Sequence, residues 1–134
     1  MGTSFSPVEI VKLGYERYAA RDFAGVFELL ADDIVVWQTD ELPWGGEHHG
    51  HDGARKFFTT LAQYTAATPE PIAFVPAGKH VAVYGKLKGE AIATRKPIDL
   101  DIVHLWQVEA GKINRFEAFI DTPAMLAALG SNDK

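Results

Sequence analysis

One histidine in an apolar, aromatic strand is the residue of this sequence best suited to chemistry. Strand alternation places His104 on one face with Leu100, Ile102 and Trp106. An imidazole among aromatic side chains can donate a hydrogen bond to a carbonyl oxygen or transfer a proton near neutral pH. We predict that His104 is the catalytic residue. The alternative is a structural histidine that is bonded to a neighbouring backbone or carboxylate group.

Aromatic side chains are numerous enough to line a pocket around that histidine. The chain has three Trp, four Tyr and eight Phe, and such residues bind flat or cyclic apolar ligands. Core packing is the competing interpretation, above all for Phe57 and Tyr18. Trp44 stands between Pro43 and Gly45, where we expect it to fold over a cavity mouth or a partner subunit. The predicted substrate-binding residues are Tyr15, Tyr18, Trp37, Trp44, Phe57, Trp106 and Phe116.

A histidine-rich loop raises the question of a metal site. His48, His49 and His51 stand beside Glu47 and Asp52. Zinc sites need ligands that converge, usually from two separate elements, and neighbouring histidines on a glycine-flanked loop point in different directions. We therefore expect no metal and no cofactor. We predict instead that the loop is a lid over the pocket, with His48 or His49 at its mouth.

Caps and periodicity define the elements in the first half of the chain. Ser6-Pro7-Val8-Glu9 is a capping box that begins a helix through about residue 21, and Asp22 caps a second, short helix. Residues 34–37 are β-branched and aromatic and predict a strand. Residues 39–51 are rich in glycine and are predicted to be irregular, and Asp52 caps a third helix.

Strands fill most of the second half. A last helix has Thr122 as its cap and ends at Gly130, and Asp121 is predicted to accept N–H bonds from its first turn. A catalytic role is the alternative for Asp121. The order of elements predicts an α+β fold, a cone-shaped barrel in which three N-terminal helices pack on a strongly curved, mostly antiparallel sheet. The predicted strands are residues 72–75, 81–87, 98–108 and 113–120.

Composition excludes several classes of function. The 134 residues predict a single domain, residues 1–134, and the net charge of −5 with scattered Lys and Arg offers no surface for nucleic acid or an anionic membrane. The absence of cysteine excludes disulfides and thiol catalysis. Residues 1–5 show no signal peptide, and no apolar run reaches the roughly 20 residues that cross a bilayer. We expect a cytoplasmic protein.

Three motifs in their order along the chain carry a resemblance to a known family. They are LADDIVVW at residues 30–37, the GHDG turn at residues 50–53, and the strand from His104 to Val108, which is followed by Gly111-Lys112-Ile113 and Asp121. The chain resembles the nuclear-transport-factor-2-like superfamily over nearly its whole length. Within that superfamily it is most similar to the SnoaL-like polyketide cyclases and the ketosteroid-isomerase relatives. The resemblance implies a sheet-lined cavity that is used for small-molecule chemistry.

The catalytic positions of those relatives are altered in this chain. The resemblance places the general-base Asp of the isomerases at Gln38, and their oxyanion-stabilising Asp at His104. It places the catalytic carboxylate of the limonene-epoxide hydrolases and the cyclases near Ala118. An amide cannot take a proton from carbon at neutral pH, and alanine carries no acid. Ketosteroid isomerisation by the mechanism of those relatives is therefore not expected.

Two functions from different classes fit these residues. The first is an enzyme that carries out cofactor-free proton transfer, such as isomerisation or cyclisation, on a small apolar carbonyl compound. His104 would be its acid/base or carbonyl-polarising group, and Tyr15 or Tyr18 a hydrogen-bond donor. The second is a non-catalytic pocket for a small hydrophobic ligand, which the missing carboxylates favour. A protein-interaction module, as in the transport-factor branch, is a third interpretation.

The outer face of the sheet predicts a protein partner. Sheets of this kind usually leave a broad apolar outer face, and Val103, Leu105 and Phe119 supply part of it here. We therefore expect a homodimer through the sheet, in addition to the small hydrophobic ligand.

Overall fold

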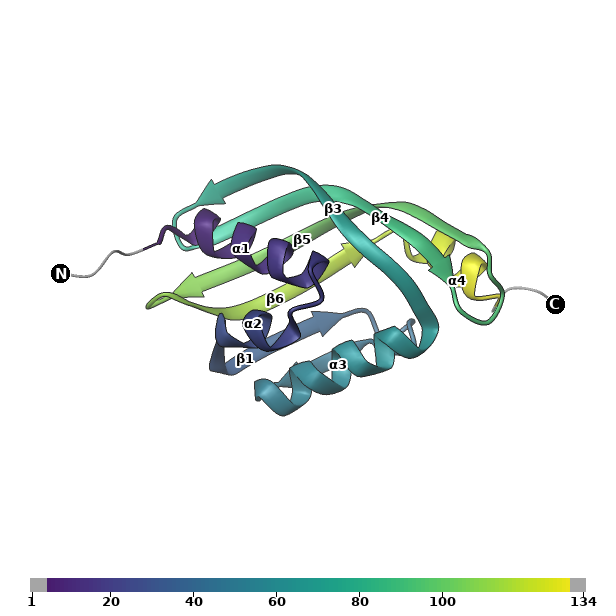
Figure 1. The fold of residues 1–134 in the computed structure, drawn as a ribbon, viewed down its shortest axis with the longest axis horizontal. Coiled ribbons are helices and arrows are strands. Elements are labelled where there is room, and N and C mark those ends of the chain that lie inside the picture. Colours follow the sequence, from purple (N-terminus) through teal and green to yellow (C-terminus); the bar gives the residue numbers. More distant parts are fainter. Residues whose placement is uncertain (1–4, 131–134) are drawn as a thin grey trace.

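A curved six-stranded sheet carries the fold, and α1, α2 and α3 lie across one of its sides (Figure 1). The computed structural model describes residues 5–130. The strand order is β2-β1-β6-β5-β4-β3, in which only β1 and β6 pair in parallel. The elements are α1 (Pro7–Ala19), α2 (Phe23–Glu28), β1 (Leu30–Gln38), β2 (Gly46–His49), α3 (Gly50–Tyr64), β3 (Thr65–Ala77), β4 (His80–Ala91), β5 (Pro97–Glu109), β6 (Lys112–Ile120) and α4 (Thr122–Leu129). The predicted α+β cone is confirmed, although the sheet stays open between β2 and β3.

The first two helices begin where their caps predict. The Ser6 hydroxyl accepts a hydrogen bond from the Glu9 amide, and the Glu9 carboxylate accepts one from the Ser6 amide. This reciprocal capping box satisfies two amides that would otherwise lack partners. The Asp22 carboxylate accepts a bond from the Gly25 amide at 2.9 Å, which confirms the second cap.

Two other caps differ from prediction. α3 begins at Gly50, two residues before Asp52, and His49 is its N-cap without a side-chain hydrogen bond. The Asp52 carboxylate instead accepts a bond from Arg55 within the first turns. At α4 the N-cap is Asp121, whose carboxylate accepts from an amide of the first turn as predicted, and Thr122 is already helical.

The prediction of irregular structure over residues 39–51 is wrong at its second half. Residues 46–49 form β2, which pairs antiparallel with β1 and places His48 opposite Val36. Gly46 and Gly50 have positive φ angles of 101° and 74° and stand at the first residue of this strand and just after its last. The two glycines therefore mark the turns at either end of a short strand, and the residues between them pair regularly with β1.

β3 is longer than predicted because prolines are tolerated at a sheet edge. The strand runs from residue 65 through Pro69 and Pro71 to residue 77, whereas the predicted strand covers only residues 72–75. It pairs only with β4, so a residue without an N–H loses no ladder bond if it faces outward. A register shift between Pro71 and Ala73 absorbs the irregularity.

Alternation along β5 separates the core from the outer face. Leu100, Ile102 and His104 are buried on the concave side, as predicted. On the other side Val103 and Leu105 are 40% and 38% exposed, as is Phe119 of β6 at 42%. The apolar outer face is therefore present.

No helix within residues 5–130 is long and apolar enough to cross a membrane. The signal-peptide interpretation concerns mainly residues 1–4, which lie outside the described residues.

Candidate functional site

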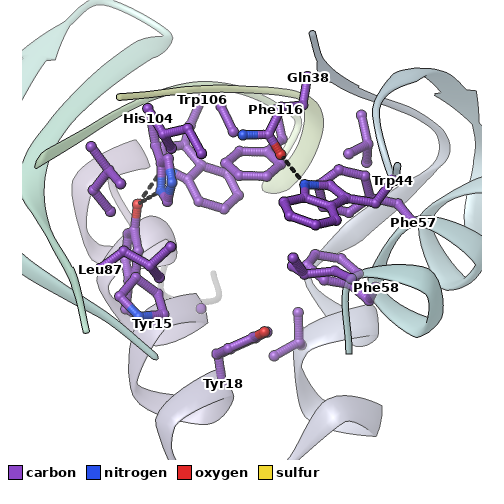
Figure 2. A pocket seen from close by; sticks show the side chains of 18 of the residues that line it. Tyr15, Tyr18, Gln38, Trp44, Phe57, Phe58, Leu87, His104, Trp106 and Phe116 are labelled. Atoms are coloured by element: carbon purple, nitrogen blue, oxygen red, sulfur yellow. Dashed lines mark hydrogen bonds between the residues drawn. The ribbon is translucent and has the colours of Figure 1, made fainter. Parts of the chain in front are cut away.

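A deep hollow lies between the concave face of the sheet and helices α1 and α3 (Figure 2). It contains about 980 Å³ free of protein atoms when its open mouth is counted, of which about 100 Å³ admits the centre of a water molecule. Aromatic and aliphatic side chains form most of its wall. No Asp, Glu, Lys or Arg of residues 5–130 lines it. Of the described residues that line it, Gln38, Thr65 and His104 are the buried polar ones, and His104 and Gln38 lie on its sheet floor.

His104 is a neutral group at physiological pH. Its residue is only 8% exposed, and burial lowers the pKa of the imidazole from its ordinary value of 6.5 to about 3. No carboxylate of residues 5–130 lies against the ring to counter this effect. A ring with so low a pKa is a weak base, which favours hydrogen-bond donation to a carbonyl oxygen over proton transfer near neutral pH.

A chain of hydrogen bonds determines which nitrogen of His104 carries the proton. The indole N–H of Trp106 donates to the Tyr15 hydroxyl oxygen at 3.0 Å, and that hydroxyl lies 2.6 Å from Nδ1 of His104. Burial raises the pKa of Tyr15, so its hydroxyl keeps its proton. Its oxygen already accepts from Trp106, and Nδ1 is the one acceptor in contact with it among residues 5–130, so we assign the O–H bond to Nδ1. The proton of the neutral ring is then on Nε2, which bonds to no residue in the range 5–130.

Gln38 is held in a similar way by a second tryptophan. The indole N–H of Trp44 donates to Oε1 of Gln38 at 2.6 Å. An indole N–H can only donate, so the amide must turn its oxygen toward Trp44 and its NH2 group away from it. Both residues are almost fully buried, Gln38 at 4% and Trp44 at 2% exposure.

The three altered catalytic positions lie in one row across the cavity floor. His104 of β5 is paired with Ala118 of β6. The register of β1 pairs Trp37 with Glu117, which puts Gln38 beside Ala118. All three line the hollow. The three positions that the resemblance singles out therefore lie together in the cavity, and the side chains there offer an imidazole and an amide in place of carboxylates.

Most of the predicted ligand-binding residues do line the cavity. Trp106 and Phe116 stack with ring centroids 4.2 Å apart, and the Phe116 ring stands edge-on to His104 at 5.0 Å. Tyr18 is at the opposite side of the hollow, and its hydroxyl has no hydrogen-bond partner among residues 5–130 (Figure 2). The predicted residues that line the cavity are Tyr15, Tyr18, Trp44, Phe57, Trp106 and Phe116, together with His104.

Trp37 is the exception, and that prediction is wrong. Along β1, Ile34, Val36 and Gln38 are buried on the cavity side, so the alternation turns Trp37 to the outer face. There its ring contacts that of Phe119 at 5.4 Å. The same alternation identifies Gln38 as a lining residue. The sequence alone had indicated Gln38 only as the position where the general-base Asp of the isomerases is replaced.

The predicted lid is also absent from this part of the molecule. Trp44 is almost fully buried in the wall of the cavity, and not on an exposed loop. Nε2 of His48 donates to the carbonyl oxygens of Trp44 and Gly45, both at 3.1 Å, and Nε2 of His51 donates to the Leu30 carbonyl oxygen at 3.0 Å. Neither residue lines the cavity, nor does His49. These histidines stabilise the β1–β2 turn and the start of α3.

Comparison with known proteins agrees with this geometry. The profile of the SnoaL-like domain matches residues 11–116. An NTF2-like protein of unknown function from Burkholderia pseudomallei is 28% identical with a TM-score of 0.86, over 92% of this chain and 96% of that chain. A candidate polyketide cyclase from Pseudomonas putida is 16% identical with a TM-score of 0.83, over 93% and 98% of the two chains. A candidate SnoaL-like polyketide cyclase from Jannaschia is 17% identical with a TM-score of 0.82, over 97% and 99%.

The last two likenesses are of fold alone, because their identities are low. No curated protein matches the chain. The domain profile, in contrast, covers most of the sequence, including Gln38, His104 and Phe116 of the cavity. The chain therefore belongs to the SnoaL-like family and has its NTF2-like cone fold.

Proposed function

We propose that this protein is a cofactor-free enzyme that binds a small apolar carbonyl compound in the cavity and promotes its isomerisation or cyclisation. His104 is the proposed catalytic residue, and it acts by donating its Nε2–H to the carbonyl oxygen. The observation that carries the proposal is the hydrogen bond between the Tyr15 hydroxyl and Nδ1 of His104, at 2.6 Å. That bond supports a neutral ring whose free N–H is available to a ligand.

A neutral hydrogen-bond donor in an apolar cavity can stabilise a carbonyl oxygen that becomes negatively charged during the reaction. When an α-proton leaves, the carbonyl oxygen becomes an enolate oxygen, and a hydrogen bond to it strengthens. Few water molecules compete in a cavity with such a wall, so the bond acts at low dielectric. Removal of one such donor typically lowers the rate by about 10²–10³.

The absence of a carboxylate limits the substrate. No Asp or Glu of residues 5–130 lines the cavity, so no side chain there is a strong base. The proposed substrates therefore have α-protons acidic enough for water to remove. The volume that admits water centres is about 100 Å³, which is less than the cavity of about 150 Å³ that holds benzene. A ligand of one or two rings must therefore extend into the open mouth, and a four-ring steroid fits poorly.

A second function has its own support. The same lack of a base, together with an imidazole that stays neutral, fits a pocket that retains a carbonyl ligand without changing it. Tyr18, Phe57 and Trp106 then serve only to enclose the ligand. The two functions share the binding mode and differ in whether the bound compound is converted.

A ligand screen followed by mass spectrometry tests both. Small cyclic ketones, terpenoids, polyketide-like aromatics and steroids are first tested for thermal stabilisation, since saturating ligand raises native-state stability by about 2.7 kcal/mol at 100 times its dissociation constant. Stabilising compounds are then incubated with the protein and analysed for products. For a converted compound we expect His104→Leu to lower the rate by about 10²–10³, and His104→Gln, which keeps a side-chain N–H, to lower it less. Binding without conversion supports the second function.

A further inference from the structure

Two tryptophans orient the two polar groups of the cavity floor. Trp106, through Tyr15, places a donor at Nδ1 of His104, and Trp44 places a donor at Oε1 of Gln38. Imidazole and amide groups can each donate and accept hydrogen bonds, but here the accepting atoms, Nδ1 of His104 and Oε1 of Gln38, already have a donor. Each side chain therefore has only N–H groups left to offer a ligand. Neither Nε2 of His104 nor the NH2 group of Gln38 bonds to another residue in the described range 5–130.

We propose that the cavity binds a neutral compound with two carbonyl-type oxygens, one accepting from His104 Nε2–H and the other from the Gln38 amide. This inference rests on the proposed use of the cavity for carbonyl binding and adds to it a second, specific contact. Gln38 is thereby a specificity-determining residue. A ligand group that can only donate a hydrogen bond finds no acceptor at this floor.

The sheet register gives the spacing of the two strands that carry the donors. His104, Ala118 and Gln38 occupy one row over three adjacent strands. Neighbouring strands are about 4.8 Å apart, so the two backbones are separated by roughly 10 Å. Between them stands Ala118, whose small side chain leaves the space above the floor open. The side chains of His104 and Gln38 both point into the cavity, and this separation leaves room for one ring of a ligand between their ends.

The charges around the cavity exclude an anionic ligand. No Lys or Arg of the described residues lines it, and an unpaired carboxylate or phosphate is costly to bury. The other hydroxyl groups near the floor are already engaged, since Tyr15 donates to His104 and Thr65 donates to the Leu61 carbonyl oxygen. The stated class is therefore a mono- or bicyclic diketone or quinone, without a charged group.

A matched series of probes tests the inference. 1,4-Naphthoquinone, 1-tetralone and tetralin share a bicyclic body and carry two, one and no carbonyl oxygens. The chain has no cysteine, so the quinone has no thiol to alkylate. Dissociation constants are measured by calorimetry for the wild type, Gln38→Met and His104→Leu. Loss of one hydrogen bond corresponds to a weakening of about threefold to tenfold.

We expect both variants to weaken binding of the quinone, and only His104→Leu to weaken binding of 1-tetralone by a comparable factor. Binding of tetralin, which has no carbonyl oxygen, should change by less than about threefold in either variant. Quinone binding that is unchanged in Gln38→Met overturns this inference, while a weakened 1-tetralone in His104→Leu would still support the proposed function. Failure of 1-tetralone binding to respond to His104→Leu contradicts the proposed function itself. Trp44→Phe is a second variant that leaves Gln38 in place but frees its amide to turn. It should reduce the preference for the quinone over 1-tetralone, and an unchanged preference also counts against the inference.

Discussion

The Tyr15 hydroxyl lies 2.6 Å from Nδ1 of His104, although the two residues are 89 positions apart in the sequence. α1 supplies the first and β5 the second, so the bond depends on how the helix packs against the concave face. Their ring planes are nearly parallel, with an interplanar angle of 3° and centroids 5.9 Å apart. This contact fixes the state of the histidine, and the account of the cavity rests on it.

Removal of the Tyr15 hydroxyl should destabilise the protein and disturb the site. In Tyr15→Phe, Nδ1 of His104 and the indole N–H of Trp106 both lose their partner. We expect a loss of about 1–3 kcal/mol in the free energy of unfolding, measured by urea denaturation. Tyr18→Phe is the matched control, because the Tyr18 hydroxyl has no partner among residues 5–130, and its effect should be small. Equal effects of the two variants would contradict the role assigned to the Tyr15 bond.

Stability should fall with acidity in a way that depends on His104. Its folded pKa of about 3 lies below the ordinary value of 6.5 that applies when the chain is unfolded. The unfolded state therefore takes up a proton at higher pH than the folded state. The stabilising contribution is complete above about pH 6.5 and is lost as the pH falls toward 3.

This pH dependence can be measured by urea denaturation between pH 7 and pH 4. We expect the wild type to lose more stability over that range than His104→Gln, which has no titrating ring. Carboxylates contribute to acid unfolding in both proteins, so the difference between the two curves isolates the histidine. Curves that run parallel would show that His104 titrates alike in the folded and unfolded states.

The two tryptophans of the β1 region should respond differently to the same substitution. Trp44→Phe leaves the buried Oε1 of Gln38 without its donor, and we expect a loss of about 1–3 kcal/mol. Trp37→Phe changes a ring on the outer face that contacts only Phe119 among the aromatic rings of the described residues. Its effect should stay within about 0.5 kcal/mol. Thermal denaturation of both variants checks this, and a larger loss in Trp37→Phe would reverse the assignment of the two faces.

The outer face should form a homodimer. Tyr84, Val103 and Phe119 are register partners across three strands, and all three are exposed. Contiguous apolar patches of this kind mark interaction surfaces. We expect a dimer mass in sedimentation at micromolar concentration, and a monomer for Phe119→Asp. Ile92→Asp is the control, because Ile92 is also exposed but lies in the turn between β4 and β5. A monomeric wild type would contradict the prediction.

The sequence predicts local features of the site better than its long-range contacts. Alternation along β5 correctly places His104 with Leu100 and Ile102, because a strand has a strict two-residue period. The same rule applied to β1 would have turned Trp37 outward and Gln38 inward. The error came from choosing residues by aromatic character rather than by their position in the strand.

Other features depend on contacts that a single sequence does not contain. The bonds from Tyr15 to His104 and from Trp44 to Gln38 require the placement of a helix and a loop against the sheet. The length of β3 depends on its being an edge strand, since prolines would break a central one. Residues 46–49 pair as β2 only because β1 offers them a free edge. Composition alone marks both segments as irregular.

The central claim is that His104 is neutral, protonated on Nε2, and donates that proton to a ligand carbonyl. The most direct test is nitrogen-15 NMR of the histidine side chains at pH 7, with His104→Gln used to assign the His104 signals. We expect a protonated Nε2 and an unprotonated Nδ1 in the free protein, and a shift of the Nε2 signal when 1-tetralone binds. A doubly protonated ring, a proton on Nδ1, or an Nε2 signal that ignores the bound ketone would contradict the claim.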